Sequence, residues 1–225
     1  NDNEAELMIA TARKNGVQLM IGHLLQYHPI FKTIRKIVDT GEIGKLNYIY
    51  SNRLSLGKVR SKEDVIWSFA PHDISMILSL AGQEPEFVST NSTSILQKNI
   101  ADTAIINLEF NSGLKSHISV SWLHPYKEHK LVVIGNFSML VFDDIKPWNE
   151  KLALYKYESV PSHGMINLDR SDVEYVRVIE EEPLKIECQH FIDVVEKNTQ
   201  PLTDGAEGLR VLKVLTAASQ SQTIK

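Results

Sequence analysis

The sequence contains a single cysteine and no long uninterrupted apolar run, and each absence excludes a class of protein. Cys188 has no second thiol with which to form an internal disulfide, a redox pair or a cysteine-based zinc site. No stretch approaches the ~18 consecutive apolar residues of a transmembrane helix, and the acidic start NDNEAELM is unlike a secretion signal. We therefore expect a cytoplasmic protein that has no membrane partner.

Basic clusters and the common catalytic motifs are also missing. The 24 basic residues are outnumbered by 28 acidic ones, and no run of lysine or arginine is long enough to follow a nucleic-acid backbone. The eleven glycines form neither a GxGxxG nor a GxxxxGK[ST] phosphate loop. HExxH, a Cys/His cluster and GxSxG are absent as well, so metal and hydrolase chemistry receive little support. We expect neither a nucleic-acid partner nor a bound metal.

The first residues have the pattern of a helix followed by a strand. Apolar residues recur at helical spacing over 5–12, behind the capping-box-like pair Asn3 and Glu6, and Gly16 is expected to end the helix. The apolar run 17–21 then predicts a buried strand. A helix, a tight turn and a buried strand form the tail of an α/β unit. Because the chain also starts without methionine, we expect it to be a fragment of a longer protein.

Two further helices and a strand are predicted before residue 85. Pro29 is expected to open one helix that ends at Gly41, and the segment 46–53 is expected to be a strand. Pro71 is expected to open the next helix, which ends at Gly82. His72 and Asp73 would then lie in the first turn of this helix.

The middle of the chain changes to the alternating pattern of strands. Residues 104–110 and 118–122 alternate apolar and polar side chains around the turn Asn111-Ser112-Gly113, which predicts a hairpin. The other predicted strands are 131–134, 139–142, 152–157 and 173–178. Residues 160–170 lack periodicity and are expected to be a flexible loop.

Two amphipathic helices are predicted at the end of the chain, one after Pro183 and one after Asp204-Gly205. Apolar residues are expected on one side of each helix. The expected fold class is therefore α+β. An open, largely antiparallel, mixed sheet of about six or more strands is expected to be covered on one face by helices.

His72, within WSFAPHD, is the strongest local candidate for chemistry. At a helix start beside aromatic residues, an imidazole is partly desolvated yet accessible. The helix N-terminal amides disfavour an imidazolium and favour a neutral His72 that can accept a proton, whereas Asp73 opposes this effect, so the net charge stays open at this point. From the residues alone, a structural or capping role for His72 is the more common outcome.

Two other polar segments are candidates for ligand contacts. The patch 23–29 follows the strand predicted at 17–21, and ligands collect at the carboxyl ends of strands in α/β units. Asn52, Arg53, Lys58 and Arg60 form a modestly basic segment that suits a carboxylate or a diphosphate. Turn or cap residues in the first segment and a solvated loop in the second remain open alternatives.

The order of motifs along the whole chain resembles the Gfo/Idh/MocA family, which is named for glucose-fructose oxidoreductase and inositol dehydrogenase. The series runs GH-x3-YHP, TGEIGKLNYIYSNR, W-x3-PHDIS, NLEFNSG, SWLHP and MLVFDD. The PHDI and YHP variants look most like the nucleotide-sugar branch, which includes UDP-N-acetylglucosamine and UDP-N-acetylglucosaminuronate 3-dehydrogenases. A collinear series of motifs is more specific than any one of them.

The resemblance implies two domains. Residues 1–22 correspond to the C-terminal remnant of a Rossmann dinucleotide-binding domain, and residues 23–225 to a substrate-binding and oligomerisation domain. The bare face of the sheet in such a domain joins subunits into a homodimer or homotetramer. NAD or NADP is bound mainly by the Rossmann domain, and the family's catalytic Glu-Lys-Pro lysine falls just before residue 1. We therefore expect the chain to be inactive alone.

The resemblance also implies the reaction and its residues. Hydride passes between a sugar carbinol carbon and the nicotinamide while a base takes the hydroxyl proton. His72 matches the family's catalytic histidine, although Ser68 stands where many members have an aspartate. Gln26 replaces a common arginine and is expected near both cofactor and substrate. The expected substrate-binding residues are Gln26, Tyr27, His28, Asn52, Arg53, Arg60 and Asp73.

Two alternative functions stay open at this point. The chain is either part of a dehydrogenase of a sugar or nucleotide-sugar, or a binding or scaffold protein that retains only the sheet domain. A dehydrogenase of the same family that acts on a free polyol or a dihydrodiol would share the mechanism and differ in substrate.

Overall fold

A computed structural model describes residues 1–162, 165–170 and 172–224. Its helices are α1 (Asp2–Lys14), α2 (Pro29–Asp39), α3 (Val65–Ala81), α4 (Pro183–Lys197) and α5 (Gly205–Gln220), with short 3-10 turns η1 (Leu24–Tyr27) and η2 (Trp148–Glu150). Its strands are β1 (Leu46–Leu56), β2 (Phe87–Thr93), β3 (Thr103–Glu109), β4 (Lys115–Ser121), β5 (Leu123–Gly135), β6 (Ser138–Asp143), β7 (Leu152–Ser162), β8 (Met165–Arg170), β9 (Glu174–Tyr175) and β10 (Gln222–Ile224).

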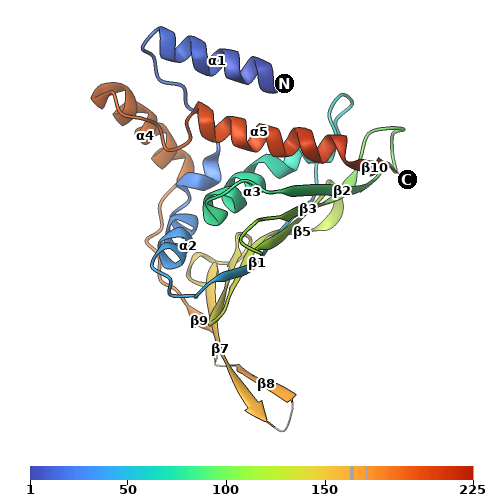
Figure 1. Cartoon of the computed structure of the whole chain (residues 1–225), viewed down its shortest axis with the longest axis vertical. Helices are drawn as coiled ribbons and strands as arrows, with labels where there is room; N and C mark the ends of the chain where they lie inside the picture. Colours follow the sequence, from blue (N-terminus) through green and yellow to red (C-terminus); the bar gives the residue numbers. More distant parts are fainter. Residues whose placement is uncertain (163–164, 171, 225) are drawn as a thin grey trace.

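The strands form one open mixed sheet in the order β10-β2-β3-β4-β1-β5-β6-β7-β8, with β9 also paired to β7. Only the β1–β4 and β10–β2 pairs are parallel among the described strands. Helix α3 packs on β1, β3 and β4, α5 packs on α3, and α1 lies outermost against α5 (Figure 1). The predicted α+β class, with an open mixed sheet covered on one face by helices, is confirmed.

The core lies between this sheet and α3, and the period-two pattern explains it. Ile106 on β3 pairs with Ile118 on β4, and both side chains are fully buried beneath the helices. Ile74 and Ile77 of α3 are fully buried in the same cluster. Burying one such side chain contributes roughly 1.5–3 kcal/mol, so this layer holds α3 firmly on the sheet.

The N-terminal segment differs from its predicted form. The capping box uses Asn1 and Glu4 in place of Asn3 and Glu6, and α1 has no buried residue. Residues 17–21 do not form a strand, because Met20 makes only a single bridge, to Asp204. No described strand lies beside them to complete a ladder.

Two glycines in the first turn of α5 allow this N-terminal segment to pack closely. A Cβ on Gly208 would lie 2.6 Å from Cγ1 of Ile21, and one on Gly205 would lie 2.7 Å from Cγ1 of Ile9. Both distances are shorter than carbon atoms in contact adopt. The two glycines therefore let α5 approach both α1 and the 17–21 segment.

The start of α3 is also corrected. The helix begins at Val65, because the Asp64 side chain accepts hydrogen bonds from the backbone N–H groups of Ile66 and Trp67. Pro71 lies inside the helix, where it removes one backbone hydrogen bond without ending the helix. His72 and Asp73 consequently lie about two turns from the helix start, not in its first turn.

Two predictions for the C-terminal half are wrong in part. The expected flexible loop at 160–170 belongs to the hairpin β7–β8, apart from residues 163 and 164, which lie outside the described residues. Figure 1 shows this hairpin extending beyond the body of the sheet. The strand predicted at 173–178 is reduced to β9, and strand β2 was not predicted.

The two C-terminal helices bury different kinds of face. Val211, Val214, Leu215 and Ala218 of α5 are buried as predicted. The predicted apolar face of α4 is instead exposed on Leu184, Phe191, Ile192 and Val195. The buried residues of α4 are Glu187 and Val194, so this helix presents its apolar face outward.

Candidate functional site

His72 is held on α3 in an environment that keeps its ring neutral. The ring is partly exposed, while its Nδ1 atom is buried and has no hydrogen-bond partner among the described residues. Burial, and then the positive charge of Arg53, lowers the pKa of His72 to about 4. The sequence left the charge of His72 open, because a helix N-terminus was expected to favour the neutral ring and Asp73 to oppose it, but the helix N-terminus lies too far away to act. His72 is therefore a free base at neutral pH.

Arg53 and Asp73 form a buried ion pair next to His72. The guanidinium Nε of Arg53 donates to Oδ2 of Asp73, and Nη2 lies 3.3 Å from Oδ1. Ser51 donates its hydroxyl hydrogen to the same carboxylate. Burial is the largest single effect on the pKa of Arg53 and lowers it, but the charge of Asp73, the hydrogen bond to Asp73 and the charge of Asp144 together raise this pKa overall. The side chains of Arg53 and Asp73 are 16% and 2% exposed, so Asp73 holds Arg53 within the protein.

A second histidine lies beside His72 in a hydrogen-bonded network. The ring centroids of His23 and His72 are 6.3 Å apart, with their planes 77° from parallel. His23 Nδ1 is 2.6 Å from Oε2 of Glu207, and Oε1 of Glu207 accepts a 2.6 Å hydrogen bond from the Ser75 hydroxyl. Gln26 donates to the same hydroxyl at 2.8 Å and to the Ser75 carbonyl at 3.0 Å. The network joins η1, α3 and α5.

His28 lies at the start of α2 and is buried among aromatic rings. Its Nδ1 atom accepts a 3.1 Å hydrogen bond from the Ile30 N–H, and its ring stacks on Trp148 with centroids 5.6 Å apart. Asp144 lies 3.8 Å from its Nε2 atom. Burial lowers the pKa of His28 to about 4, against the opposing effect of Asp144. His28 thus caps α2 as a neutral ring.

The remaining predicted residues do not all gather near His72. Tyr27 is buried, with its hydroxyl 2.8 Å from that of Thr203. Asn52 alternates with Arg53 along β1 and so faces the bare side of the sheet, where it donates to Glu128. Arg60 lies in an exposed segment, 3.1 Å from Glu63. The structure therefore brings Gln26, Arg53 and Asp73 towards His72 and separates Asn52 from it.

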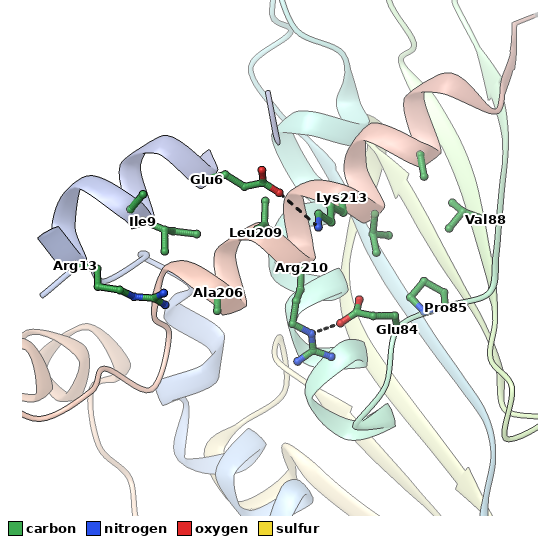
Figure 2. A pocket seen from close by; sticks show the side chains of 13 residues that line it. Glu6, Ile9, Arg13, Glu84, Pro85, Val88, Ala206, Leu209, Arg210 and Lys213 are labelled. Carbon is green, nitrogen blue, oxygen red and sulfur yellow. Dashed lines mark hydrogen bonds and ion pairs between the residues drawn. The ribbon is translucent and has the colours of Figure 1, made fainter. Parts of the chain in front are cut away.

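Two of the cavities that border α5 concern the site. One of about 330 Å³ lies beside the network and is lined by Gln26, Arg35, Ser75 and Glu207, among others. Figure 2 shows the other, a groove of about 680 Å³ between α1 and α5 with apolar walls and with Arg13 and Lys213 at its edge. None of the residues predicted from the sequence as site residues lines this groove. The predicted site residues that lie together therefore do so at the network and not at the larger groove.

Sequence reasoning missed Glu207 and Ser75. Glu207 lies in the first turn of α5, where its backbone N–H donates to Asp204. An acidic residue in the first turn is usually explained by its favourable interaction with the helix N-terminus, so it does not indicate a site. Within the part of the chain that the structure describes, no group of three or more His, Cys, Asp or Glu side chains is placed to hold a metal ion. None of the described helices is both long and apolar enough to cross a membrane.

Acid is expected to destabilise the fold through its buried histidines. Burial is the first cause that lowers the pKa values of His28, His72 and His129 to about 4, whereas an unfolded histidine has a pKa of about 6.5. Between about pH 6.5 and 4 the unfolded chain binds more protons, so the free energy of unfolding falls as the pH drops, on the order of a few kcal/mol in total. Urea unfolding at a series of pH values measures this, and a His129→Gln variant should show a shallower fall. An unfolding free energy that stays constant across this window would contradict the expectation.

Comparison with known proteins identifies relatives over nearly the whole chain. Residues 31–141 match the family model described as the GFO/IDH/MocA C-terminal domain. The chain is 24% identical over 212 residues to UDP-N-acetylglucosamine 3-dehydrogenase of Acidithiobacillus ferrooxidans, covering 93% of this chain and 64% of that protein. It is also 24% identical over 216 residues to inositol 2-dehydrogenase of Rhizobium meliloti, covering 91% and 62%. The chain thus spans less than two thirds of the length of either relative.

Solved structures share the fold. UDP-N-acetylglucosamine 3-dehydrogenase GnnA from Acidithiobacillus ferrooxidans has a TM-score of 0.81 at 23% identity, covering 98% of this chain and 69% of that chain. An oxidoreductase from Agrobacterium radiobacter, solved in complex with NAD+, L-tartaric acid and magnesium, has a TM-score of 0.75 at 15% identity, covering 98% and 67%. At these identities the similarity concerns the fold.

Proposed function

Because this chain belongs to the Gfo/Idh/MocA family of oxidoreductases through its C-terminal domain, we propose that it is the substrate-binding and oligomerisation part of an NAD(P)-dependent dehydrogenase. Residues 23–225 form that part, and residues 1–22 complete a dinucleotide-binding domain that supplies the rest of the catalyst. The substrate is a sugar or nucleotide-sugar hydroxyl. The name of the relative from Acidithiobacillus ferrooxidans favours a nucleotide-sugar.

One observation carries the proposal: His72 is a neutral, partly exposed imidazole whose Nδ1 atom has no partner among the described residues. A base of this kind accepts the proton of a carbinol hydroxyl. When bound, the nicotinamide supplies the hydride acceptor, and the side chains of this domain orient the sugar and take its proton. Arg53, fixed by Asp73, disfavours charge on His72 before the substrate arrives.

The fit to a cofactor is partial. The network around His72 suits the reacting end of a nicotinamide, because it presents an imidazole and a carboxylate–histidine pair. The amide nitrogen of Gln26, in contrast, already donates to Ser75, so a cofactor contact through Gln26 would involve its oxygen. The sequence has no GxGxxG loop that could bind the cofactor's pyrophosphate. In this proposal the dinucleotide-binding domain binds the pyrophosphate.

The bare face of the sheet supports the oligomer. Tyr50 stacks on His117 with centroids 5.2 Å apart, and the Tyr48 hydroxyl lies 2.8 Å from Nδ1 of His117. Ile105 on the same face is 46% exposed. Aromatic and apolar side chains on a helix-free face suit a protein interface, so we propose a homodimer or homotetramer through it.

Steady-state assays test the function. The chain joined to its dinucleotide-binding domain should reduce NAD or NADP in the presence of UDP-N-acetylglucosamine, and the 225-residue chain alone should not. Free inositol and glucose serve as the comparison substrates. Greater activity with a free polyol than with UDP-N-acetylglucosamine would show that the substrate is a free polyol and not a nucleotide-sugar. If the joined protein reduced neither cofactor with any of these substrates, the proposed function would be wrong.

A further inference from the structure

His23 and Glu207 form a carboxylate–histidine pair between segments that are 184 positions apart in the sequence. The Nδ1 and Oε2 atoms lie 2.6 Å apart, and the two side chains are only 9% and 19% exposed. A carboxylate beside one ring nitrogen selects the tautomer that carries its proton there. Neutral His23 therefore has Nδ1–H bound to Glu207, which leaves Nε2 with a free lone pair.

Glu207 is itself held rigidly. Its Oε1 atom accepts a 2.6 Å hydrogen bond from Ser75, and Gln26 donates to that same hydroxyl at 2.8 Å. Its backbone N–H donates to Asp204 at 2.8 Å at the start of α5. A carboxylate fixed at both its oxygens and its backbone orients its histidine with little freedom.

Resting on the proposed function, we propose that Glu207 is a positioning residue that holds His23 as the second proton acceptor of the site, receiving the substrate proton from His72. The two imidazoles stand edge to face with their ring centroids 6.3 Å apart, and a proton can pass between neighbouring groups through one water molecule. Ser68 lies one turn before His72 on α3 and has no carboxylate that could accept the proton from His72.

The proton and electron balance is complete with the nicotinamide as oxidant. With a nicotinamide bound as the oxidant, the carbinol carbon would give up a hydride, with its two electrons, while the hydroxyl proton passes to His72. His72 then gives a proton to Nε2 of His23, whose positive charge is balanced by Glu207. The products are a carbonyl, a reduced nicotinamide and one proton that leaves through His23. Burial lowers the pKa of His72 and so disfavours a proton that stays on its ring at neutral pH.

Charged groups from α3, α4, α5 and β1 face this pair of rings. Around His23 these are Glu207 of α5 and Glu187 of α4, whose pKa is raised by burial and lowered in part by His23. Around His72 they are Arg53 of β1 and Asp73 of α3, and a charged His23 itself lowers the pKa of His72. The surroundings thus disfavour charge on His72 and place a carboxylate directly against His23.

Imidazole nitrogen shifts in the 225-residue chain test the pair directly. At about pH 9, well above the ordinary histidine pKa of about 6.5, His23 should be the Nδ1–H tautomer. Glu207→Gln should keep this tautomer, because an amide oxygen also accepts, whereas Glu207→Leu should lose it. Glu196→Gln, the same change on an exposed helical residue of α4, should alter nothing.

Kinetics of the joined enzyme test the relay. Glu207→Gln and Glu207→Leu should lower kcat by about 10–100-fold with KM little changed, and the acid limb of the pH profile should move relative to Glu196→Gln. The inference about Glu207 and His23 would be wrong if His23 were the Nε2–H tautomer in the parent. It would also be wrong if the kcat of Glu207→Leu stayed within about threefold of the control, and neither result would contradict the proposed function. A parent enzyme that reduces no nicotinamide would overturn the proposed function and the relay together, whatever the tautomer.

Discussion

Replacing Asp73 with alanine should lower the free energy of unfolding by about 3–5 kcal/mol, because it leaves the buried charge of Arg53 without a partner. Asp73 is 1% exposed and accepts hydrogen bonds from Arg53 and Ser51, so its removal orphans two polar groups at once. Urea unfolding of the 225-residue chain at neutral pH measures the loss. No other single ion pair described in this protein is buried as deeply on both sides.

Two further variants show whether the loss comes from the unpaired charge. Asp193→Ala breaks a surface ion pair with Lys197 on α4 and should leave the free energy of unfolding nearly unchanged. In a double variant, Asp73→Leu with Arg53→Met, both charges are replaced by apolar groups, and part of the lost stability should return. An Asp73→Ala variant within about 1 kcal/mol of the parent would show that Arg53 finds another partner or reaches water.

Replacing His72 with alanine should lower kcat/KM of the joined enzyme by about 10²–10⁴-fold, the usual contribution of a general base. The expected cause is chemical and not structural, because the ring is partly exposed and its Nδ1 atom makes no hydrogen bond among the described residues. The unfolding free energy should therefore change far less than in Asp73→Ala. Initial rates of nicotinamide reduction, with urea unfolding of the same variant, make the comparison.

His124→Ala is the matched control for His72→Ala. His124 lies at the start of β5, where its ring contacts the Tyr126 carbonyl, outside the network. Its replacement should leave the rate within about twofold of the parent, an expectation that follows from the absence of any contact with the network. If His72→Ala retained turnover within about threefold of the parent, His72 would not be the base.

Elements whose signals are local were predicted correctly. Pro29 opens α2, the alternation on β3 and β4 gives the hairpin, and the apolar stripe of α5 is buried. In each case the periodicity of the residues and the face they bury agree, so no distant contact is needed to decide the structure.

Predictions failed where a distant or competing contact decides. The sequence predicts a helix start at Pro71, but Asp64 caps the helix earlier, and the burial of Val65 and Ile66 holds the first turn in place. The apolar run 17–21 has the composition of a strand but no neighbouring strand among the described residues. The sequence of the hairpin β7–β8 has no clear alternation of apolar and polar residues, so the hairpin is recognised only from the pairing of its two strands.

Some residues of the candidate site could likewise be identified from local sequence, and others could not. His72 was identifiable because it lies in a motif that can be recognised along the chain, and Gln26 likewise. Glu207 was not, because its partner His23 lies 184 positions away and nothing in either segment specifies that they meet.

By itself, then, the sequence determined the family, the α+β class, most of the helices and strands, and the candidacy of His72, since these depend on periodicity and motif order. Only the tertiary structure decided that Asp73 holds Arg53, that Asn52 faces the opposite side of the sheet, and why His72 is neutral. The physical reason is that burial and charge proximity are properties of neighbours in space. The chain brings those neighbours together only after α3 and α5 have packed on the sheet.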